Sequence, residues 1–112
     1  MKKIEALIRP ERLDPVMDAL RVLGYPGVTL TEVRGHGKQK GVTQVWRGSE
    51  YRVEFIPKIK LEAVVLDEDA GKVANSIMKA ARTGSSGDGK IFIYDVEDAV
   101  RIRTGEAGFQ AI

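Results

Sequence analysis

The chain has 112 residues, no cysteine and a formal charge of +2 at neutral pH. This length suits one domain with its own core, and the lack of cysteine excludes a disulfide framework and a thiolate metal site. Charges of both signs alternate, and no apolar run resembles a signal peptide or approaches the ~18 residues of a membrane span. We therefore expect a cytoplasmic protein that binds no nucleic acid and does not insert into membranes.

The first third of the chain predicts a strand, a helix and a second strand. Residues 3–9 alternate between apolar and polar side chains, as in a half-buried strand, and Pro10 ends the alternation. An apolar stripe at helical spacing follows and ends at Gly24, and residues 28–34 alternate again. The side chains expected in the core are Ile4, Ala6 and Ile8 of the strand, and Leu13, Val16, Met17, Leu20 and Leu23 of the helix.

The same order of elements then repeats. Residues 56–66 predict a long strand, Asp67 is the expected N-cap of a second helix, and residues 90–96 predict the last strand. Strand, helix and strand, twice over, give the α+β ferredoxin-like βαββαβ fold, as a single domain over residues 1–112. The apolar stripe of the second helix consists of Ala70, Val73, Ala74, Ile77 and Ala81.

Two helices can cover only one face of a four-stranded sheet, so part of the opposite face needs another cover. Self-association is the simplest way to provide it, and a cleft between subunits is a natural ligand site. The opposite face carries a mixture of apolar, polar and charged side chains, namely Leu7, Thr29, Lys58, Lys60, Glu62 and Val64.

A glycine-rich segment joins the second predicted helix to the last predicted strand and ends in Lys90. Three glycines in six residues permit backbone angles that other residues avoid, so successive N–H groups can surround an anion such as phosphate. The order of elements and the spacing are not those of an ATPase P-loop. Taken alone, such a segment is more often a flexible turn, so the phosphate interpretation depends on clusters elsewhere.

A long insertion, residues 37–55, separates the second and third predicted strands, although a hairpin needs only ~2–5 residues. Loops of this length within a domain are usually functional or disordered. Trp46 and Tyr51 lie in this polar segment, and large aromatic side chains are typical interface anchors. We therefore favour a loop that partners bind over an unstructured extension.

Two further basic clusters accompany the glycine-rich segment. The first, at the start of the long loop, contains Lys38 and Lys40 among glycines. The second lies near the C-terminus, where alternation places Arg101 and Arg103 on one face, as on an edge strand. Together with Lys90 these side chains supply more positive charge than one carboxylate requires, and they suit a triphosphate.

With these clusters in place, the chain resembles the PII signal-transduction proteins of bacterial, archaeal and plastid nitrogen regulation over essentially its whole length. The resemblance implies a homotrimer with nucleotide sites in the clefts between subunits. It also implies a T-loop at about 37–55, a B-loop at about 82–90 and a C-terminal loop at about 101–112. The most specific motifs are Thr83-Gly84-x-x-Gly87-Asp88-Gly89-Lys90-Ile91-Phe92, Arg101-Ile102-Arg103-Thr104-Gly105-Glu106, and Gln39-Lys40-Gly41 followed by Arg47-Gly48-Ser49-Glu50-Tyr51.

The resemblance further implies which residues bind nucleotide. The B-loop of one subunit would bind the phosphates, Arg101 and Arg103 would reach the same phosphates across the interface, and Thr29 would lie near the base. ATP and ADP would compete for this site. The implied set is Leu7, Thr29, Gly35, Gly37, Lys38, Gln39, Glu62, Val64, Gly87, Asp88, Gly89, Lys90, Arg101 and Arg103.

With MgATP bound, the resemblance implies a 2-oxoglutarate site at the base of the T-loop. Gln39 would ligate Mg²⁺ through its side-chain oxygen, and Lys58 would pair with a carboxylate of 2-oxoglutarate. The ligand state would set the shape of the T-loop, which docks on ammonium transporters and nitrogen-metabolism enzymes in this family. The implied 2-oxoglutarate set is Gln39, Lys40, Gly41, Lys58 and Gly87.

Several T-loop positions match or depart from the family pattern. Tyr51 matches a tyrosine that some relatives uridylylate or adenylylate, Ser49 matches a phosphorylation position in others, and Arg47 belongs to the same motif. Trp46 stands where the family usually has Tyr. His36 stands where an aromatic residue, often Phe, is common; it is a candidate to stack on or sense the nucleotide, and no ligand partner marks it as a metal site.

Four other functions share parts of this pattern. A nucleoside diphosphate kinase needs a histidine in its own surroundings, and the single histidine lies at a loop edge, so we expect no enzyme. An RNA-binding ferredoxin-like module needs an aromatic motif that is absent, and periodicity places Phe92 and Tyr94 in the helix-packed core. A trimeric metal-tolerance protein would lack the nucleotide motifs. An adenylate sensor of the PII-like type, with a different small effector, is the main alternative.

Overall fold

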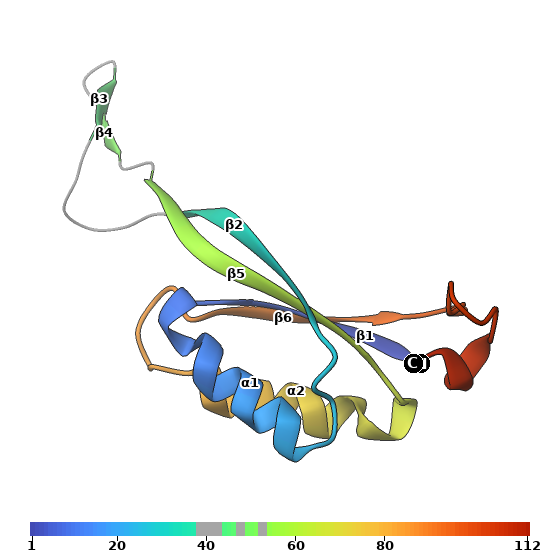
Figure 1. Ribbon diagram of the computed structural model, residues 1–112. Helices are drawn as coiled ribbons and strands as arrows, with labels where there is room; N and C mark the ends of the chain where they lie inside the picture. Colours follow the sequence, from blue (N-terminus) through green and yellow to red (C-terminus); the bar gives the residue numbers. More distant parts are fainter. Residues whose placement is uncertain (38–43, 47–48, 52–53) are drawn as a thin grey trace.

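The computed structural model describes residues 1–37, 44–46, 49–51 and 54–112. Its main feature is a four-stranded antiparallel sheet in the order β2-β5-β1-β6, accompanied by two α-helices (Figure 1). This is the ferredoxin-like βαββαβ arrangement predicted from the sequence. The elements are β1 (Lys2–Ile8), η1 (Pro10–Arg12), α1 (Leu13–Val22), β2 (Thr29–Gly37), β3 (Gln44–Trp46), β4 (Ser49–Tyr51), β5 (Glu54–Val65), α2 (Asp67–Ala81), β6 (Gly89–Asp95) and η2 (Gly108–Ala111).

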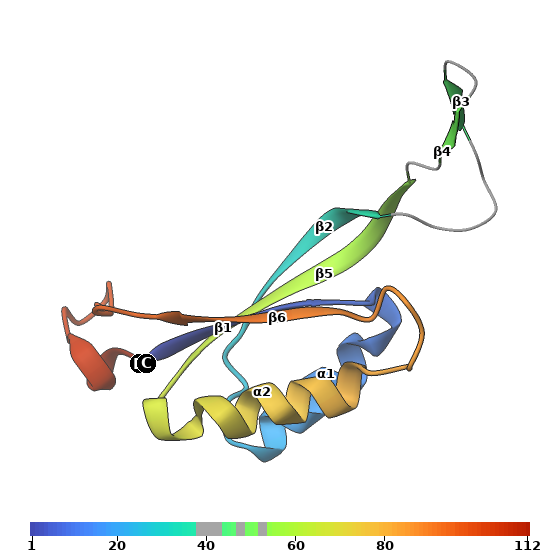
Figure 2. The ribbon, with the colours of Figure 1, turned by 180° about the vertical axis from the view of Figure 1, so that it is seen from behind.

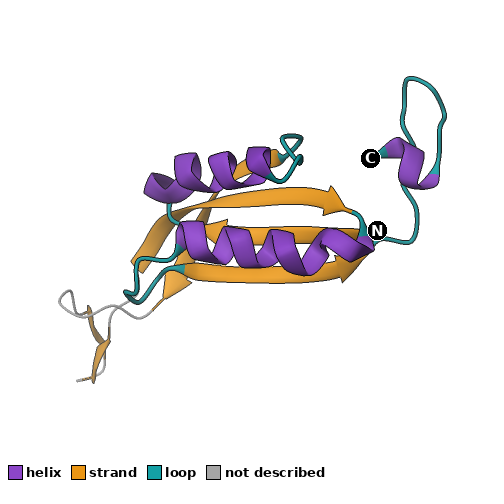
Figure 3. Ribbon diagram, turned by 90° about the horizontal axis from the view of Figure 1, so that it is seen from below, coloured by secondary structure: helices purple, strands orange, loops and turns teal. Residues whose placement is uncertain are grey.

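Both α-helices lie on the same face of the sheet, and the core forms between the two layers (Figure 3). The alternation of the strands and the apolar stripes of the helices place their side chains there as predicted, except that Ala74 of the α2 stripe lies outside the core and is partly exposed. Each fully buried Leu or Ile contributes about 1.5–3 kcal/mol. The buried residues are Ile4, Ala6, Ile8, Val16, Leu20, Leu61, Ala63, Val65, Ala70, Val73, Ile77 and Ala81.

The start of α2 differs from the prediction that Asp67 is its N-cap. Asp67 is the first helical residue, and the cap position is occupied by Leu66, whose side chain offers no hydrogen bond. The Asp67 carboxylate instead lies 2.8 Å from the amino group of Met1, and this contact lowers the pKa of Asp67. Three acidic residues in the first turn, Asp67, Glu68 and Asp69, still favour a helix start through its dipole.

The prediction that Phe92 and Tyr94 lie in the core is wrong. Register with β1 places Phe92 opposite Glu5 and Tyr94 opposite Lys3, on the face that no helix covers, and both aromatic side chains are about half exposed. The Tyr94 hydroxyl donates to Glu5 at 3.3 Å. Because this edge strand is apolar on both faces, its alternation does not reveal which face packs against the helices, and Ile91 takes the inward position instead.

Strands β2 and β5 continue well beyond β1 and β6, and together they form an arm (Figures 1 and 2). The last pair between β1 and β5 is Ile8 with Ile59, whereas β2 stays paired with β5 as far as Gly37. On the arm the rings of His36 and Phe55 lie 5.5 Å apart. A separate two-stranded sheet of β3 and β4 contains the predicted T-loop positions Trp46, Ser49 and Tyr51.

Candidate functional site

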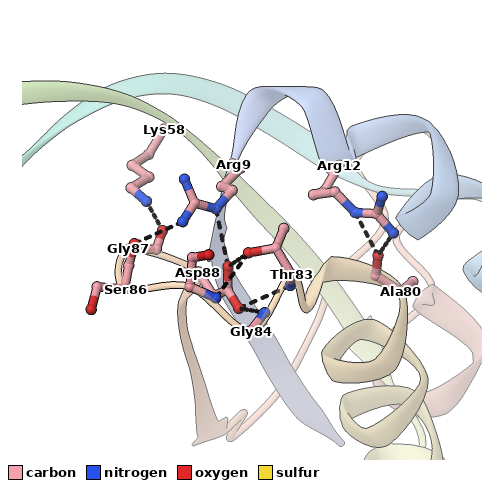
Figure 4. A network of polar contacts seen from close by, with 10 residues as sticks. Arg9, Arg12, Lys58, Ala80, Thr83, Gly84, Ser86, Gly87 and Asp88 are labelled. Atoms are coloured by element: carbon pink, nitrogen blue, oxygen red, sulfur yellow. Dashed lines mark hydrogen bonds and ion pairs between the residues drawn. The ribbon is translucent and has the colours of Figure 1, made fainter.

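The B-loop joins the end of α2 to the start of β6 and lies beside the end of β1 (Figure 4). Gly87 and Gly89 adopt φ angles of 96° and 107°, which residues other than glycine rarely adopt. A Cβ atom on Gly89 would lie only 1.7 Å from the carbonyl oxygen of Leu7. This loop shape therefore requires glycine at both positions. Because glycine has no side chain, the backbone of the loop stays accessible to a ligand.

The side chain of Asp88 stabilises the shape of the B-loop through hydrogen bonds. Its carboxylate accepts hydrogen bonds from the backbone N–H groups of Thr83 and Gly84, both at 2.9 Å, and from the Thr83 hydroxyl. Arg9 Nε donates to the same carboxylate at 3.0 Å. The Thr83 hydroxyl, the backbone N–H groups and Arg9 hold the pKa of Asp88 well below its usual range. With these donors the side chain of Asp88 is directed at its own loop, so its role in this structure is to hold the shape of the loop.

Two cations converge on Gly87. Arg9 Nη2 donates to the Ser86 carbonyl oxygen at 2.7 Å, and Lys58 Nζ donates to the carbonyl oxygen of Gly87 (Figure 4). A Cβ atom on Gly87 would lie 3.4 Å from Arg9 Nη2 and 3.7 Å from Lys58 Nζ. Partial burial and, second, the charge of Arg9 lower the pKa of Lys58. An anion beside Gly87 would relieve this repulsion, so the pair suits an acidic ligand.

Arg9 belongs to none of the three motifs, and the sequence alone does not single it out. The signal that could have found it is the strand order, because a ferredoxin-like sheet pairs its first and last strands. Ile8 lies opposite Gly89, so the residue that follows β1 must lie at the B-loop. Lys58 and Gly87, which the resemblance assigns to one ligand, lie in contact with each other.

The remaining nucleotide candidates of the sheet lie in three places. Leu7 lies opposite Lys90, close to the B-loop. Thr29 and Glu62 face each other nearer the other end of the open face, where Lys3 Nζ donates to Glu62 at 3.3 Å. This second group borders a cavity of about 780 Å³ that reaches the C-terminal segment, and its lining includes Thr29, Glu62, Val64, Phe109 and Ile112. Gly35 and Gly37 lie on the arm.

The C-terminal loop lies at the opposite end of β6 from the B-loop (Figures 1 and 2). Arg101 N–H donates to the Glu106 carbonyl oxygen, and Gly105 N–H to that of Arg101, both at 2.8 Å. This closed turn corrects the expectation that Arg101 and Arg103 share a face of an edge strand. The seven residues of β6 extend over about 20 Å, so these arginines cannot meet Lys90 of their own chain at one phosphate.

Metal sites and membrane-spanning helices can be assessed only for the described residues. In that part of the chain no three His, Cys, Asp or Glu side chains are arranged to hold a metal ion, and no helix is long and apolar enough to cross a membrane. The predicted Mg²⁺ ligand lies outside the described residues. Its predicted neighbours and the T-loop position Arg47 also lie outside the described residues. The predicted site residues outside that part of the chain are therefore Lys38, Gln39, Lys40, Gly41 and Arg47.

Comparison with known proteins assigns the chain to a family. The family described as nitrogen regulatory protein P-II matches residues 1–106. Nitrogen regulatory protein P-II of Pasteurella multocida is 55% identical and that of Rhizobium meliloti 54% identical, each over 112 residues and the full length of both chains. Nitrogen regulatory protein P-II 2 of Methanothermobacter thermautotrophicus is 54% identical over the whole chain and 97% of its own length. The chain therefore belongs to the nitrogen regulatory protein P-II family, whose members are signal transducers and not enzymes.

Proposed function

We propose that the protein is a cytoplasmic homotrimer that binds ATP or ADP in the clefts between its subunits and 2-oxoglutarate together with MgATP. The T-loop passes the ligand state to an ammonium transporter or to enzymes of nitrogen metabolism. Members of the family bind these ligands and act as trimers on regulatory targets. The observation that carries the proposal is the preformed B-loop, where Arg9 and Lys58 converge on Gly87.

The nucleotide site needs two subunits because its parts lie at opposite ends of one chain. The B-loop offers backbone N–H groups and Lys90 for the phosphates. The neighbouring subunit contributes Arg101 and Arg103, which add charge-assisted hydrogen bonds. A contact between unlike ends of successive subunits is heterologous, and it gives a closed trimer when the rotation between subunits is one third of a turn. In this arrangement Thr29 lies near the base, and Leu7 and Val64 are among the residues around the nucleotide.

The 2-oxoglutarate site uses the cation pair at the B-loop. Lys58 pairs with one carboxylate, and Arg9 holds the backbone of Ser86 and Gly87 in place. Gln39 would supply its amide oxygen, which is the kind of ligand that Mg²⁺ prefers. When bound, Mg²⁺ would supply positive charge that offsets the negative charges of ATP and 2-oxoglutarate. Lys40 and Gly41 are the remaining residues of the proposed 2-oxoglutarate set.

Two rivals differ in what they require. The cation pair fits any small acid, so an adenylate sensor with another acidic effector uses the same residues and differs only in the ligand. An RNA-binding module could stack bases on Phe92 and Tyr94, which lie on the open face. However, the Tyr94 hydroxyl already donates to Glu5 and Lys3 Nζ lies 5.0 Å from the centre of the Tyr94 ring, so this ring is occupied by contacts within the chain.

Light scattering and ATP titration test the proposed assembly and nucleotide site. We expect a particle of three 12.3 kDa chains that binds ATP and ADP in mutual competition. A monomer that binds neither nucleotide would refute the proposal.

Replacement of Gln39 separates the two ligands. We expect Gln39→Ala to weaken 2-oxoglutarate binding by more than about 10-fold, because a metal contact shared with the effector is lost. ATP should lose far less affinity, since the B-loop and the arginines stay intact. Gln44→Ala, which removes the same amide elsewhere in the T-loop, is the matched control and should change neither ligand. Calorimetric titrations measure both, and equal losses for ATP and 2-oxoglutarate would speak against the assignment.

A further inference from the structure

The C-terminal end of α2 leads directly into the B-loop, and a side chain from another part of the chain holds it. Arg12, the last residue of η1, donates from Nε at 3.0 Å and from Nη2 at 2.6 Å to the carbonyl oxygen of Ala80. The last carbonyl groups of an α-helix have no partner within the helix, and they form the negative end of its dipole. A guanidinium group at this position satisfies both the hydrogen bond and the charge.

This contact matters because α2 ends without the glycine that often closes a helix. The cap residue is Arg82, whose backbone is extended, and its N–H makes the last helical bond, to the carbonyl oxygen of Met78 at 3.1 Å. The next N–H group, that of Thr83, already belongs to the B-loop, since it donates to the Asp88 carboxylate at 2.9 Å. The direction in which the chain leaves α2 therefore sets where the B-loop begins.

Arg12 shares this task with Arg9, which lies at the other end of η1. The Arg12 N–H donates to the Arg9 carbonyl oxygen at 3.0 Å and closes the turn. Residues three apart in a 3₁₀ turn lie on the same side, and Figure 4 shows both guanidinium groups directed towards the end of α2 and the B-loop. Arg9 binds the far part of the loop, at Ser86 and Asp88, whereas Arg12 binds the helix end from which the loop starts.

We propose that Arg12 is a positioning residue of the nucleotide site, and that Arg9 and Arg12 together form a clamp that sets the shape of the B-loop before a ligand binds. The inference rests on the proposed nucleotide site. A loop that already has its bound shape loses less conformational entropy when phosphate arrives. Loss of Arg12 therefore weakens nucleotide binding, although its side-chain hydrogen bonds go to the helix and not to the loop.

Arg12→Ala tests the clamp. We expect calorimetry to show that ATP and ADP bind about 3–10-fold more weakly, the effect of one hydrogen bond that orders a site. Without nucleotide, hydrogen exchange of the Arg82 and Thr83 N–H groups, followed by NMR, should quicken several-fold because the last turn of α2 is released. Arg12→Lys should restore most of both properties, since both guanidinium nitrogens donate to one oxygen and a single ammonium group can replace them.

Two controls separate positioning from general stability. Arg21→Ala removes the same kind of side chain from an exposed ion pair on α1, and it should change neither ATP affinity nor exchange of the two N–H groups. Val73→Ala truncates a fully buried core residue in the first half of α2. This variant should lower the unfolding temperature at least as much as Arg12→Ala does, and yet bind ATP as the wild-type protein does.

The outcomes distinguish this inference from the proposed function. A folded Arg12→Ala variant with wild-type ATP affinity and unchanged exchange would overturn the clamp and leave the nucleotide site standing. An equal loss of ATP affinity in Val73→Ala, or a loss in Arg12→Lys as large as in Arg12→Ala, would also overturn it. If the wild-type protein bound no nucleotide, the proposed function would fail, whereas faster exchange in Arg12→Ala would still support the clamp, because exchange needs no ligand.

Discussion

Gly89→Ala is expected to destabilise the protein by about 2–4 kcal/mol and to abolish ATP binding. The added Cβ would lie 1.7 Å from the carbonyl oxygen of Leu7, and a φ of 107° is itself strained for alanine. Backbone atoms on both sides would have to move, and the pairing of Gly89 with Ile8 would be lost with the loop shape. Urea denaturation measures the free energy of unfolding, and calorimetry measures ATP affinity.

Gly71→Ala is the matched control for this substitution. Gly71 lies inside α2, and no described atom lies within 4 Å of the position of its Cβ. Alanine is the better helix former, so this variant should gain about 0.5–1 kcal/mol and bind ATP normally. If Gly89→Ala were as stable as Gly71→Ala and bound ATP as well, the B-loop described here would not be the one that functions.

Asp88→Ala is expected to lower ATP affinity by about 10–100-fold, the effect of losing charge-assisted hydrogen bonds that shape a site. Without the carboxylate, the N–H groups of Thr83 and Gly84 lose their acceptor, and Arg9 keeps only its bond to the Ser86 carbonyl oxygen. Removing a negative charge near phosphate acts in the opposite direction. We expect the loss of shape to dominate, because the charge of Asp88 is already balanced by its donors.

Asp18→Ala provides the control, since Asp18 forms an exposed ion pair with Arg21 on α1 and should not affect ATP binding. The pH dependence adds a second check. Because the folded-state pKa of Asp88 is lowered, its stabilising effect is present above about pH 3.9, the unfolded pKa, and is lost only as the pH falls towards the lowered value. Tighter ATP binding by Asp88→Ala would show that repulsion by the carboxylate outweighs its ordering of the loop.

Much of the fold could be predicted because its periodic patterns are one-sided. The alternation in β1 and the stripe of α2 each have one apolar side, so the sequence determines which side is buried. The strand β6 is apolar on both sides, and only pairing with β1 decides that Phe92 and Tyr94 face outward. The cap of α2 was misplaced by one residue because Asp67 can serve either as a cap or in the first turn.

The candidate site, like the fold, could be predicted only in part. The glycines and Lys90 stand in contiguous motifs and could be found by reading the sequence. Arg9 could not, since its role arises from the approach of β1 to the B-loop across nearly eighty residues of sequence. Likewise, alternation at Arg101 and Arg103 looked like a strand, whereas backbone hydrogen bonds close that segment into a turn. Local sequence patterns identify residues with suitable chemistry, and long-range strand pairing decides which of these residues lie close together.

The most direct test of the central claim is calorimetric titration of 2-oxoglutarate into the wild-type protein with and without MgATP. The account predicts binding only when MgATP is present, and no such gain with ADP, which lacks the γ-phosphate. Coupling must be reciprocal, so 2-oxoglutarate should tighten ATP by the same factor. Binding of 2-oxoglutarate that is equally tight without nucleotide, or absent even with MgATP, would contradict a shared site at Lys58 and Gly87.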